Sequence, residues 1–405
     1  MTNIEVEVVR ESIDTNHIVK KLKIGSLGLI TPLRAIDARL LCRLPQDVAN
    51  KLVGLTPIIE YYRIIPDRKI IKLVSGAEYI PSINYQIKKV LRCVTRYRAP
   101  FLFIPVIGIK ELRKEFTGEE ALKRIIEFLI DTQEPSPISA YISPSLRLAN
   151  ELVAKYREKL IDLYGSIIDI FLEYIKTGKK KPIGITIPLS IVPYQYLRGI
   201  LEYLFNEGIN FLVFDMGARV PINYYQYFAL TYRVANEVFG DYKFLLYVAN
   251  PNIGKPSKLS EVVTAKDLLS YGIGIDILGD KHTNRAVFLM KGEDVSGTDI
   301  SMPRILSRKD YGYYRLPDLR NMRKLIDPYT IIPRDPLISE ERDIRSMWRR
   351  AYNTEQVGKE TRNLNELIIK NESLIKYLKP KFCVKEEHVK IIVKAKESVR
   401  GGKLI

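Results

Sequence analysis

Three short apolar segments succeed one another at helix-length intervals: INFLVFDMG (209–217), YKFLLYVANP (242–251) and IGIDILGD (273–280). Each is a run of strand-forming residues that ends in Gly, Asn or Asp, which is typical of a strand buried on both faces. The first interval, INYYQYFALTYRVANEVFG (222–240), carries apolar residues at helical spacing. Parallel neighbours need a crossover of this length, so the three segments indicate a parallel sheet.

The same alternation extends toward the N-terminus. Four more segments have the composition of buried strands: KIIKLVSG (69–76), FLFIPVIG (101–108), ISAYISP (138–144) and PIGITIPL (182–189). Three stretches between the strands are predicted to be helical, at 118–130, 145–175 and 193–208. Seven such strands with intervening helices favour an α/β protein with a (β/α)8 TIM barrel. A doubly wound open sheet is the alternative, although no G-x-G-x-x-G fingerprint follows the first strand.

The two ends of the chain differ from this pattern. Residues 4–40 alternate short β-like runs with turn residues and predict an opening strand or hairpin region. After residue 300 the sequence is irregular, then predicts helices around 337–378 and a short strand in VKIIVKAK (389–396). We therefore expect a barrel domain over 1–300 and a basic, α-rich C-terminal region over 301–405.

Composition excludes several classes of protein. The 405 residues are 46% hydrophobic and 27% charged, as in an ordinary globular chain, and no uninterrupted apolar run reaches the length of about 18 residues that a membrane span needs. The N-terminus has no signal-peptide pattern. Cys42, Cys93 and Cys383 are too few and too scattered for a disulfide framework or a zinc knuckle. We expect a cytoplasmic protein that has no membrane segment, no structural zinc and no cofactor.

The charge is strongly positive. The chain carries 64 Lys and Arg residues against 47 Asp and Glu residues, a formal net charge of +17. Residues 301–405 hold 24 basic and 14 acidic residues, so the C-terminal region is the stronger candidate for contact with a polyanion. A solvated basic surface without a partner remains the alternative.

Polar residues follow the expected strands, where a barrel places its active site. They are Ser75, Gly76 and Glu78; Asp131 and Glu134; Asp215 and Arg219; Asn250 and Asn252; and Asp276, Asp280, His282 and Arg285. Converging carboxylates are suited to acid–base or nucleophilic chemistry, whereas a single strand-end Asp or Asn more often caps a helix. Asp280 and His282 alone are too few for a metal site, so we predict none.

Five segments, in order, resemble the tRNA-guanine transglycosylase superfamily, in particular its archaeal, archaeosine-type branch. They are LKIGSLGLITPLRAIDA (22–38), KIIKLVSGAEYI (69–80), FLIDTQEPSP (128–137), KPIGITIPLSIVPYQYL (181–197) and DLLSYGIGIDILGDKHTNRAVF (267–288). AYNTEQVGKETRNLNELI (351–368) is similar to the family's helix after its zinc loop. The resemblance implies a TIM barrel that binds a guanine flipped out of RNA and exchanges it for a 7-deazaguanine through a covalent Asp intermediate.

The resemblance also assigns candidate residues. The catalytic candidates are Asp280 as nucleophile and Glu78, Asp131 or Asp215 as acid–base; the base-binding candidates are Ser75, Gly76, Gly184 and Tyr79. The departures concern the catalytic positions themselves, because the family's two aspartates align with Val74 and Gly279 and its zinc-binding cysteines are absent. Neither Val nor Gly can transfer a proton or attack a sugar.

Two functions follow from the resemblance. One is a paralogue without catalysis that binds tRNA or another nucleic acid, or pairs with an active transglycosylase subunit. The other is an active enzyme that inserts a modified base into tRNA or DNA with Asp280 as nucleophile. The candidates for nucleic-acid contact are Lys281, Arg285, Arg304, Arg308 and Arg315, with nearby tyrosines for stacking. Packing of those tyrosines against the barrel is the alternative.

Overall fold

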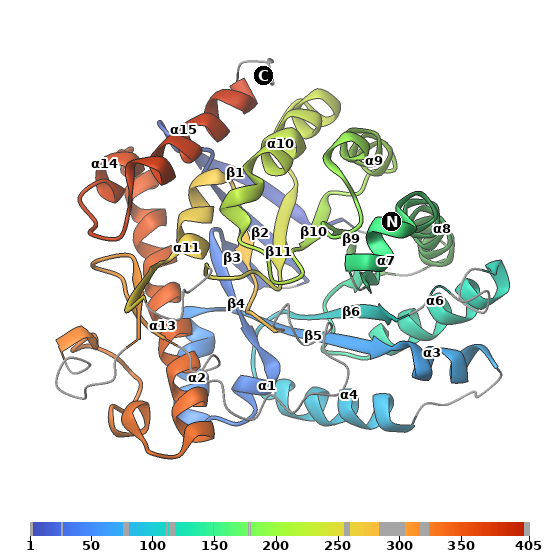
Figure 1. Ribbon diagram of the computed structural model, residues 1–405, viewed down its shortest axis with the longest axis horizontal. Coiled ribbons are helices and arrows are strands. Elements are labelled where there is room, and N and C mark those ends of the chain that lie inside the picture. Colours follow the sequence, from blue (N-terminus) through green and yellow to red (C-terminus); the bar gives the residue numbers. More distant parts are fainter. Residues whose placement is uncertain are drawn as a thin grey trace.

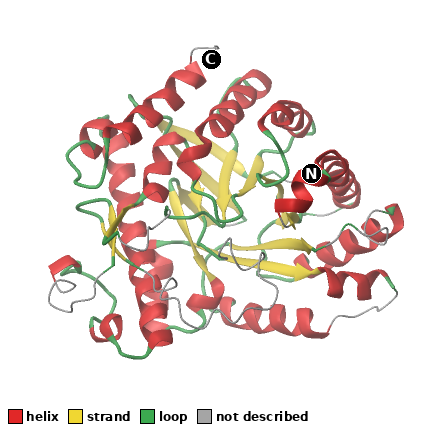
Figure 2. Cartoon of the chain, in the orientation of Figure 1, coloured by secondary structure: helices red, strands yellow, loops and turns green. Residues whose placement is uncertain are grey.

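Parallel strands of one long sheet form the centre of the molecule, and helices surround them (Figures 1 and 2). The computed structural model describes residues 3–25, 27–75, 81–110, 112, 118–148, 150–176, 178, 180–254, 260–282, 304–315 and 324–400. The mixed α/β class predicted from the sequence is confirmed.

The sheet has nine strands in the order β7-β9-β10-β11-β13-β4-β5-β6-β8, and all pairs are parallel. The strands are β4 (Leu33–Asp37), β5 (Ile58–Pro66), β6 (Phe101–Ile109), β7 (Tyr141–Ile142), β8 (Ser145–Leu148), β9 (Ile183–Pro188), β10 (Phe211–Asp215), β11 (Leu245–Ala249) and β13 (Ile277–Leu278). The sheet curls so strongly that its two end strands, β7 and β8, are separated by only two residues of the chain. The curled parallel sheet is compatible with a TIM-like fold.

Alternate residues of the strands enter two separate cores. On β11, Leu245, Tyr247 and Ala249 belong to one apolar cluster, while Leu246 and Val248 belong to the other. Successive side chains of a strand point to opposite faces, so both faces of the sheet are buried. This burial explains why the strands read as continuous apolar runs in the sequence.

An antiparallel sheet of β1 (Glu5–Glu11), β2 (Ile18–Ile24) and β3 (Leu27–Ile30) precedes the parallel strands, which confirms the predicted hairpin region. Leu22 and Leu29 of this sheet join the same cluster as Tyr247. Lys20 on β2 is completely buried and donates to Asp276 just before β13, over 2.8 Å. A buried ion pair of this kind fixes register, because either charge alone would be costly to bury.

Helices cover the outer face of the sheet, and the four helical stretches predicted in the first 300 residues are present. The helices are α1 (Ala38–Leu41), α2 (Gln46–Leu55), α3 (Asp67–Val74), α4 (Pro81–Val94), α6 (Glu119–Gln133), α7 (Asn150–Lys155), α8 (Arg157–Lys176), α9 (Tyr194–Asn206), α10 (Tyr225–Phe239), α11 (Lys266–Leu269), α13 (Arg342–Ile369), α14 (Leu374–Leu378) and α15 (Glu386–Arg400). In the predicted stretch 145–175, the first four residues form β8 instead. No helix within the described ranges is long and apolar enough to pass through a membrane.

Two predicted strands are wrong. The described residues 69–75 of the predicted strand KIIKLVSG (69–76) lie on α3 and its end. The actual strand is the preceding IIEYYRIIP (58–66), whose Glu and Arg interrupt its β pattern. VKIIVKAK (389–396) lies on α15, where Val389, Ile392 and Ala395 are buried at helical spacing. The short strand β4 was also missed, because it lies within residues 4–40, which we predicted to be a strand or hairpin region.

The cysteines differ from expectation as well. We expected no disulfide framework, yet Cys42 at the end of α1 is bonded to Cys93 on α4, with Cα atoms 5.9 Å apart. The two residues are 51 positions apart in sequence and meet only because α1 and α4 pack together. Cys383 is a buried free thiol.

The C-terminal region packs directly on the sheet-forming part. β12 (Val262–Thr264) lies before the expected boundary at residue 300 and pairs with β15 (Gly312–Tyr314) after it, while β15 also pairs with β14 (Ile305–Ser307). Helix α13, 28 residues long, contacts both β4 and α2. This packing brings side chains of α13 next to the ends of the parallel strands.

Candidate functional site

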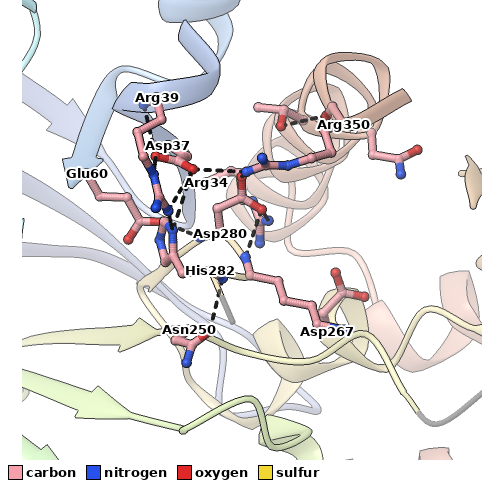
Figure 3. A network of polar contacts seen from close by, with 12 residues as sticks. Arg34, Asp37, Arg39, Glu60, Asn250, Asp267, Asp280, His282 and Arg350 are labelled. Carbon is pink, nitrogen blue, oxygen red and sulfur yellow. Dashed lines mark hydrogen bonds and ion pairs between the residues drawn. The ribbon is translucent and has the colours of Figure 1, made fainter. Parts of the chain in front are cut away.

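Charged side chains converge where β4, β5, β11 and β13 run toward their carboxyl ends (Figure 3). Parallel strands place these ends at one edge of the sheet, so residues distant in sequence meet there. We call this group the mouth cluster: Arg34, Asp37, Arg39, Glu60, Asn250, Asp280, His282 and Arg350. Arg350 comes from α13 and the others from the strands or the residues that follow them.

Asp280 is held between two arginines. Its Oδ1 accepts a hydrogen bond from Arg34 Nη2 at 3.1 Å, and its Oδ2 accepts one from Arg350 Nη2 at 2.9 Å. Burial alone would raise the pKa of this carboxyl, but the charges of Arg350 and Arg34 lower it below its usual value. Asp280 is therefore an ionised carboxylate with both oxygens occupied.

Asp37 shares one of these arginines. Arg350 Nη2 donates to Asp37 Oδ2 at 3.0 Å, and Arg39 donates to both carboxylate oxygens. Asp37 is completely buried; although burial raises its pKa, the nearby His282, Arg39 and Arg350 hold that pKa well below the usual range. Arg350 thus links the end of β4 to the residues after β13.

His282 lies in the middle of the cluster. Its Nε2 is 2.9 Å from Glu60 Oε1, and its ring stacks on Tyr62 with centroids 5.0 Å apart. Its Nδ1 faces Asp37 Oδ2 at 3.6 Å and lies 2.9 Å from an Arg39 nitrogen. Burial lowers the pKa of His282, but the negative charges of Glu60 and Asp37 outweigh it and raise that pKa to about 9.

Gly279 has no room for a side chain. A Cβ atom at this position would lie 2.7 Å from Glu60 Oε2 and 2.9 Å from the Tyr247 hydroxyl. Both groups are buried, and Tyr247 donates a hydrogen bond to Glu60. The space beside Gly279, the position that the predicted resemblance assigns to a nucleophile, is therefore filled by neighbouring side chains.

Asp215, at the end of β10, has a different set of partners. Its Oδ2 accepts from the Tyr62 hydroxyl at 3.0 Å and from Ser145 Oγ at 2.6 Å, and its Oδ1 accepts from the Gly217 N–H at 3.0 Å. Because Tyr62 lies on β5 and Ser145 on β8, Asp215 connects the end of β10 to two other strands. Tyr62 joins it to the mouth cluster, since the same ring stacks on His282.

The structure brings together some predicted site residues and separates others. Asp280 lies in the mouth cluster and Asp215 beside it, whereas Asp131 is exposed on α6 and Ser75 is exposed at the end of α3. Gly184 lies within β9, where a Cβ atom would meet the Phe211 ring at 2.8 Å, so a glycine is needed there for packing. Val74 is on α3 rather than at a strand end. Gly76, Glu78 and Tyr79 lie outside the described residues.

Three of the predicted nucleic-acid contacts, Arg304, Arg308 and Lys281, have partners inside the protein. Arg304 donates to the backbone carbonyls of Ser260 and Glu261, and Arg308 binds Gln356 and Asp327. Lys281 is partly buried and its Nζ donates to Asn252 at 3.3 Å, while burial lowers its pKa. Arg315 is exposed, and Arg285 lies outside the described residues.

Five members of the cluster were missed by sequence reasoning: Arg34, Asp37, Arg39, Glu60 and Arg350. Charges within apolar strand-like runs were a usable signal for Arg34, Asp37 and Glu60, because a charge inside a buried strand needs a partner. No local pattern distinguishes Arg350 from the other arginines of α13. His282, in contrast, was among the predicted strand-end residues.

Neither a comparison with models of known protein families nor one with curated proteins finds a match to this chain. Within the described part of the chain, no group of three or more His, Cys, Asp or Glu side chains is arranged to hold a metal ion. The side chains of the mouth cluster can hold a proton on His282, but the oxygens of Asp280 are directed at cations.

We predict that Gly279→Ala destabilises the protein by about 1 to 3 kcal/mol, because the added methyl group must displace Glu60 or Tyr247. Chemical denaturation measures this loss. Gly199→Ala is the matched control, because a Cβ there meets no atom within 4 Å. Equal stability of the two variants would contradict the crowding at Gly279.

The protonation of His282 predicts a pH dependence of stability. Its folded pKa of about 9 lies above the unfolded value of 6.5, so its contribution is complete below about pH 6.5 and is lost as pH rises through 9. The shift corresponds to about 3 kcal/mol by linkage. Free energies of unfolding at pH 6.5 and 9.5 should differ less in His282→Gln than in the wild type; equal differences would show that His282 is not the titrating group.

Proposed function

We propose that this protein is a transglycosylase-like nucleic-acid-binding protein without base-exchange activity. It acts in the cytoplasm on tRNA or another nucleic acid, either alone or as a non-catalytic partner of an active transglycosylase subunit. The main support for the absence of base exchange is that both carboxylate oxygens of Asp280 accept hydrogen bonds from arginines. A carboxylate that attacks a ribose carbon needs a free lone pair directed at that carbon.

The neighbouring position supports the same conclusion. Gly279 aligns with the family's nucleophile, and Glu60 and Tyr247 occupy the space that an aspartate side chain would need. Restoring the family's residue would therefore also require these two side chains to move. The other acid–base candidates among the described residues, Asp131 and Asp215, are respectively exposed on a helix and saturated with hydrogen-bond donors.

Binding of nucleic acid is supported by the net charge of +17 and by the five family-like segments. The mouth cluster itself contributes little to an attractive field, because its carboxylates and cations neutralise one another. Attraction to a polyanion must come from basic residues elsewhere on the protein.

We further propose that the curled sheet closes into a (β/α)8 barrel. β7 and β8 pair with opposite ends of the remaining sheet and are separated by two residues, so together they serve as one interrupted strand. Phe101 on β6 also forms a parallel bridge with Ile138, just before β7. With β7 and β8 counted as one, the strands follow one another around the sheet in chain order, as in a barrel.

The second candidate function is base exchange with Asp280 as nucleophile. It is favoured by the ionised state of Asp280, whose pKa is lowered, and by its place beside a histidine that can hold a proton. In this case a substrate must displace Arg350 from Asp280 before attack.

Incubation of the protein with radiolabelled guanine and unmodified host tRNA separates the two functions. We expect no label in the RNA, with the tRNA retained on a filter by the protein. An Asp280→Asn variant serves as the control. Label incorporated by the wild type and lost in this variant would establish the enzyme and contradict the proposal.

A further inference from the structure

One segment holds the whole charge excess of the first 300 residues. Residues 61–98 contain nine basic and two acidic residues, an excess of seven. Residues 1–300 together contain 40 basic and 33 acidic residues, so the remainder of this part is balanced. The segment comprises the end of β5, α3 and α4, and α4 lies on the rim of the molecule (Figure 1).

Helix α4 divides sharply into two faces. Its inner face is buried in the main core through Ile83, Ile87, Val90, Leu91 and Val94. Its outer face presents Tyr85, which is 66% exposed, with exposed Lys88, Lys89 and Arg92. Arg96 follows one turn beyond Arg92 and is also exposed. Residues three and four apart lie next to one another on a helix, so these side chains form one stripe.

The cations of this stripe have no acidic partner among the residues that the structure describes. In the part of the chain that the structure describes, no carboxylate pairs with Lys88, Lys89, Arg92 or Arg96, and α4 itself contains no acidic residue. Helix α6 shows the ordinary arrangement, in which Lys123 pairs with Glu119 at 2.7 Å. Unpaired cations in a row remain available to an external anion.

The stripe is also held in a fixed position. Cys93 on α4 is covalently bonded to Cys42 at the end of α1. The apolar inner face anchors the rest of the helix against the core. A binding surface that is already ordered avoids the entropic cost of ordering on association.

We propose that the outer face of α4, consisting of Tyr85, Lys88, Lys89 and Arg92 together with Arg96, binds the backbone of RNA. The cations contact successive phosphates, and Tyr85 stacks on an unpaired base. This inference rests on the proposed function and assigns its RNA-contacting surface. The sequence indicated the basic C-terminal region as the contact surface, whereas we now assign it to α4. The reason is that Arg304 and Arg308 of the C-terminal region form hydrogen bonds within the protein.

The test compares two triple variants of the full chain that remove equal charge. Lys88→Gln/Lys89→Gln/Arg92→Gln alters α4, and Lys370→Gln/Lys376→Gln/Lys379→Gln alters exposed lysines of the C-terminal region. Filter binding of unmodified tRNA is measured for each from 50 to 300 mM salt. We expect the α4 variant to bind about tenfold or more weakly at 0.1 M salt, with a salt slope lower by about 2 to 3. The C-terminal variant should retain most of its affinity.

The outcomes separate this inference from the function on which it rests. No tRNA binding by the wild type would overturn both the α4 surface and the tRNA binding that the proposed function includes. Binding by the wild type with equal losses in the two variants, or a larger loss in the C-terminal variant, would overturn the α4 surface alone. Thermal unfolding at the wild-type temperature shows that each variant is folded. Binding of phosphatidylserine vesicles without binding of tRNA would assign α4 to a lipid surface and contradict the proposal.

Discussion

The mouth cluster depends on Arg350, whose guanidinium joins Asp37 at the end of β4 to Asp280 after β13. Buried carboxylates are tolerated only when cations and hydrogen bonds compensate for lost hydration. Without Arg350, Asp37 would retain Arg39 and Asp280 would retain Arg34, but the connection between the two strand ends would be lost. The same bond fixes α13 over the mouth, so the C-terminal region and the sheet are parts of one arrangement.

The charged residues of the mouth cluster and those of α4 differ in whether they are paired. In the mouth, cations and carboxylates are paired, and this pairing stabilises the fold while it removes the free nucleophile that glycosyl transfer requires. On α4, cations are exposed and unpaired among the described residues, and we propose that they bind phosphates. A protein that retains the fold of an enzyme and binds RNA without chemistry would have this distribution.

Strands that are apolar on both faces could be recognised from the sequence, whereas the strand that carries charged residues could not. The strands at 209–217, 242–251 and 273–280 could be recognised because both of their faces are apolar. The strand at 58–66 was missed because Glu60 and Arg63 interrupt its pattern, and that same Glu60 is a member of the mouth cluster. A charged residue such as Glu60, which takes part in the mouth cluster, interrupts the apolar pattern from which a buried strand is recognised.

Long-range partners were beyond the reach of sequence reasoning. The Cys42–Cys93 bond and the position of Arg350 depend on how helices pack, which no local pattern encodes. Asp280 and His282 could be anticipated because residues after a buried strand must meet at the end of the sheet. Their partner Arg350 could not, since it lies 70 residues from Asp280 along the chain.

A double-mutant cycle between Asp280 and Arg350 tests the central claim most directly. The free energy of unfolding is measured for Asp280→Asn, Arg350→Met and the double variant, with the exposed Glu5–Lys23 pair as the control. We predict a coupling of about 2 kcal/mol between Asp280 and Arg350 and well under 1 kcal/mol for the control. If the effects of the two single variants simply add, the carboxylate of Asp280 is free of Arg350, and the account of a mouth closed to catalysis is contradicted.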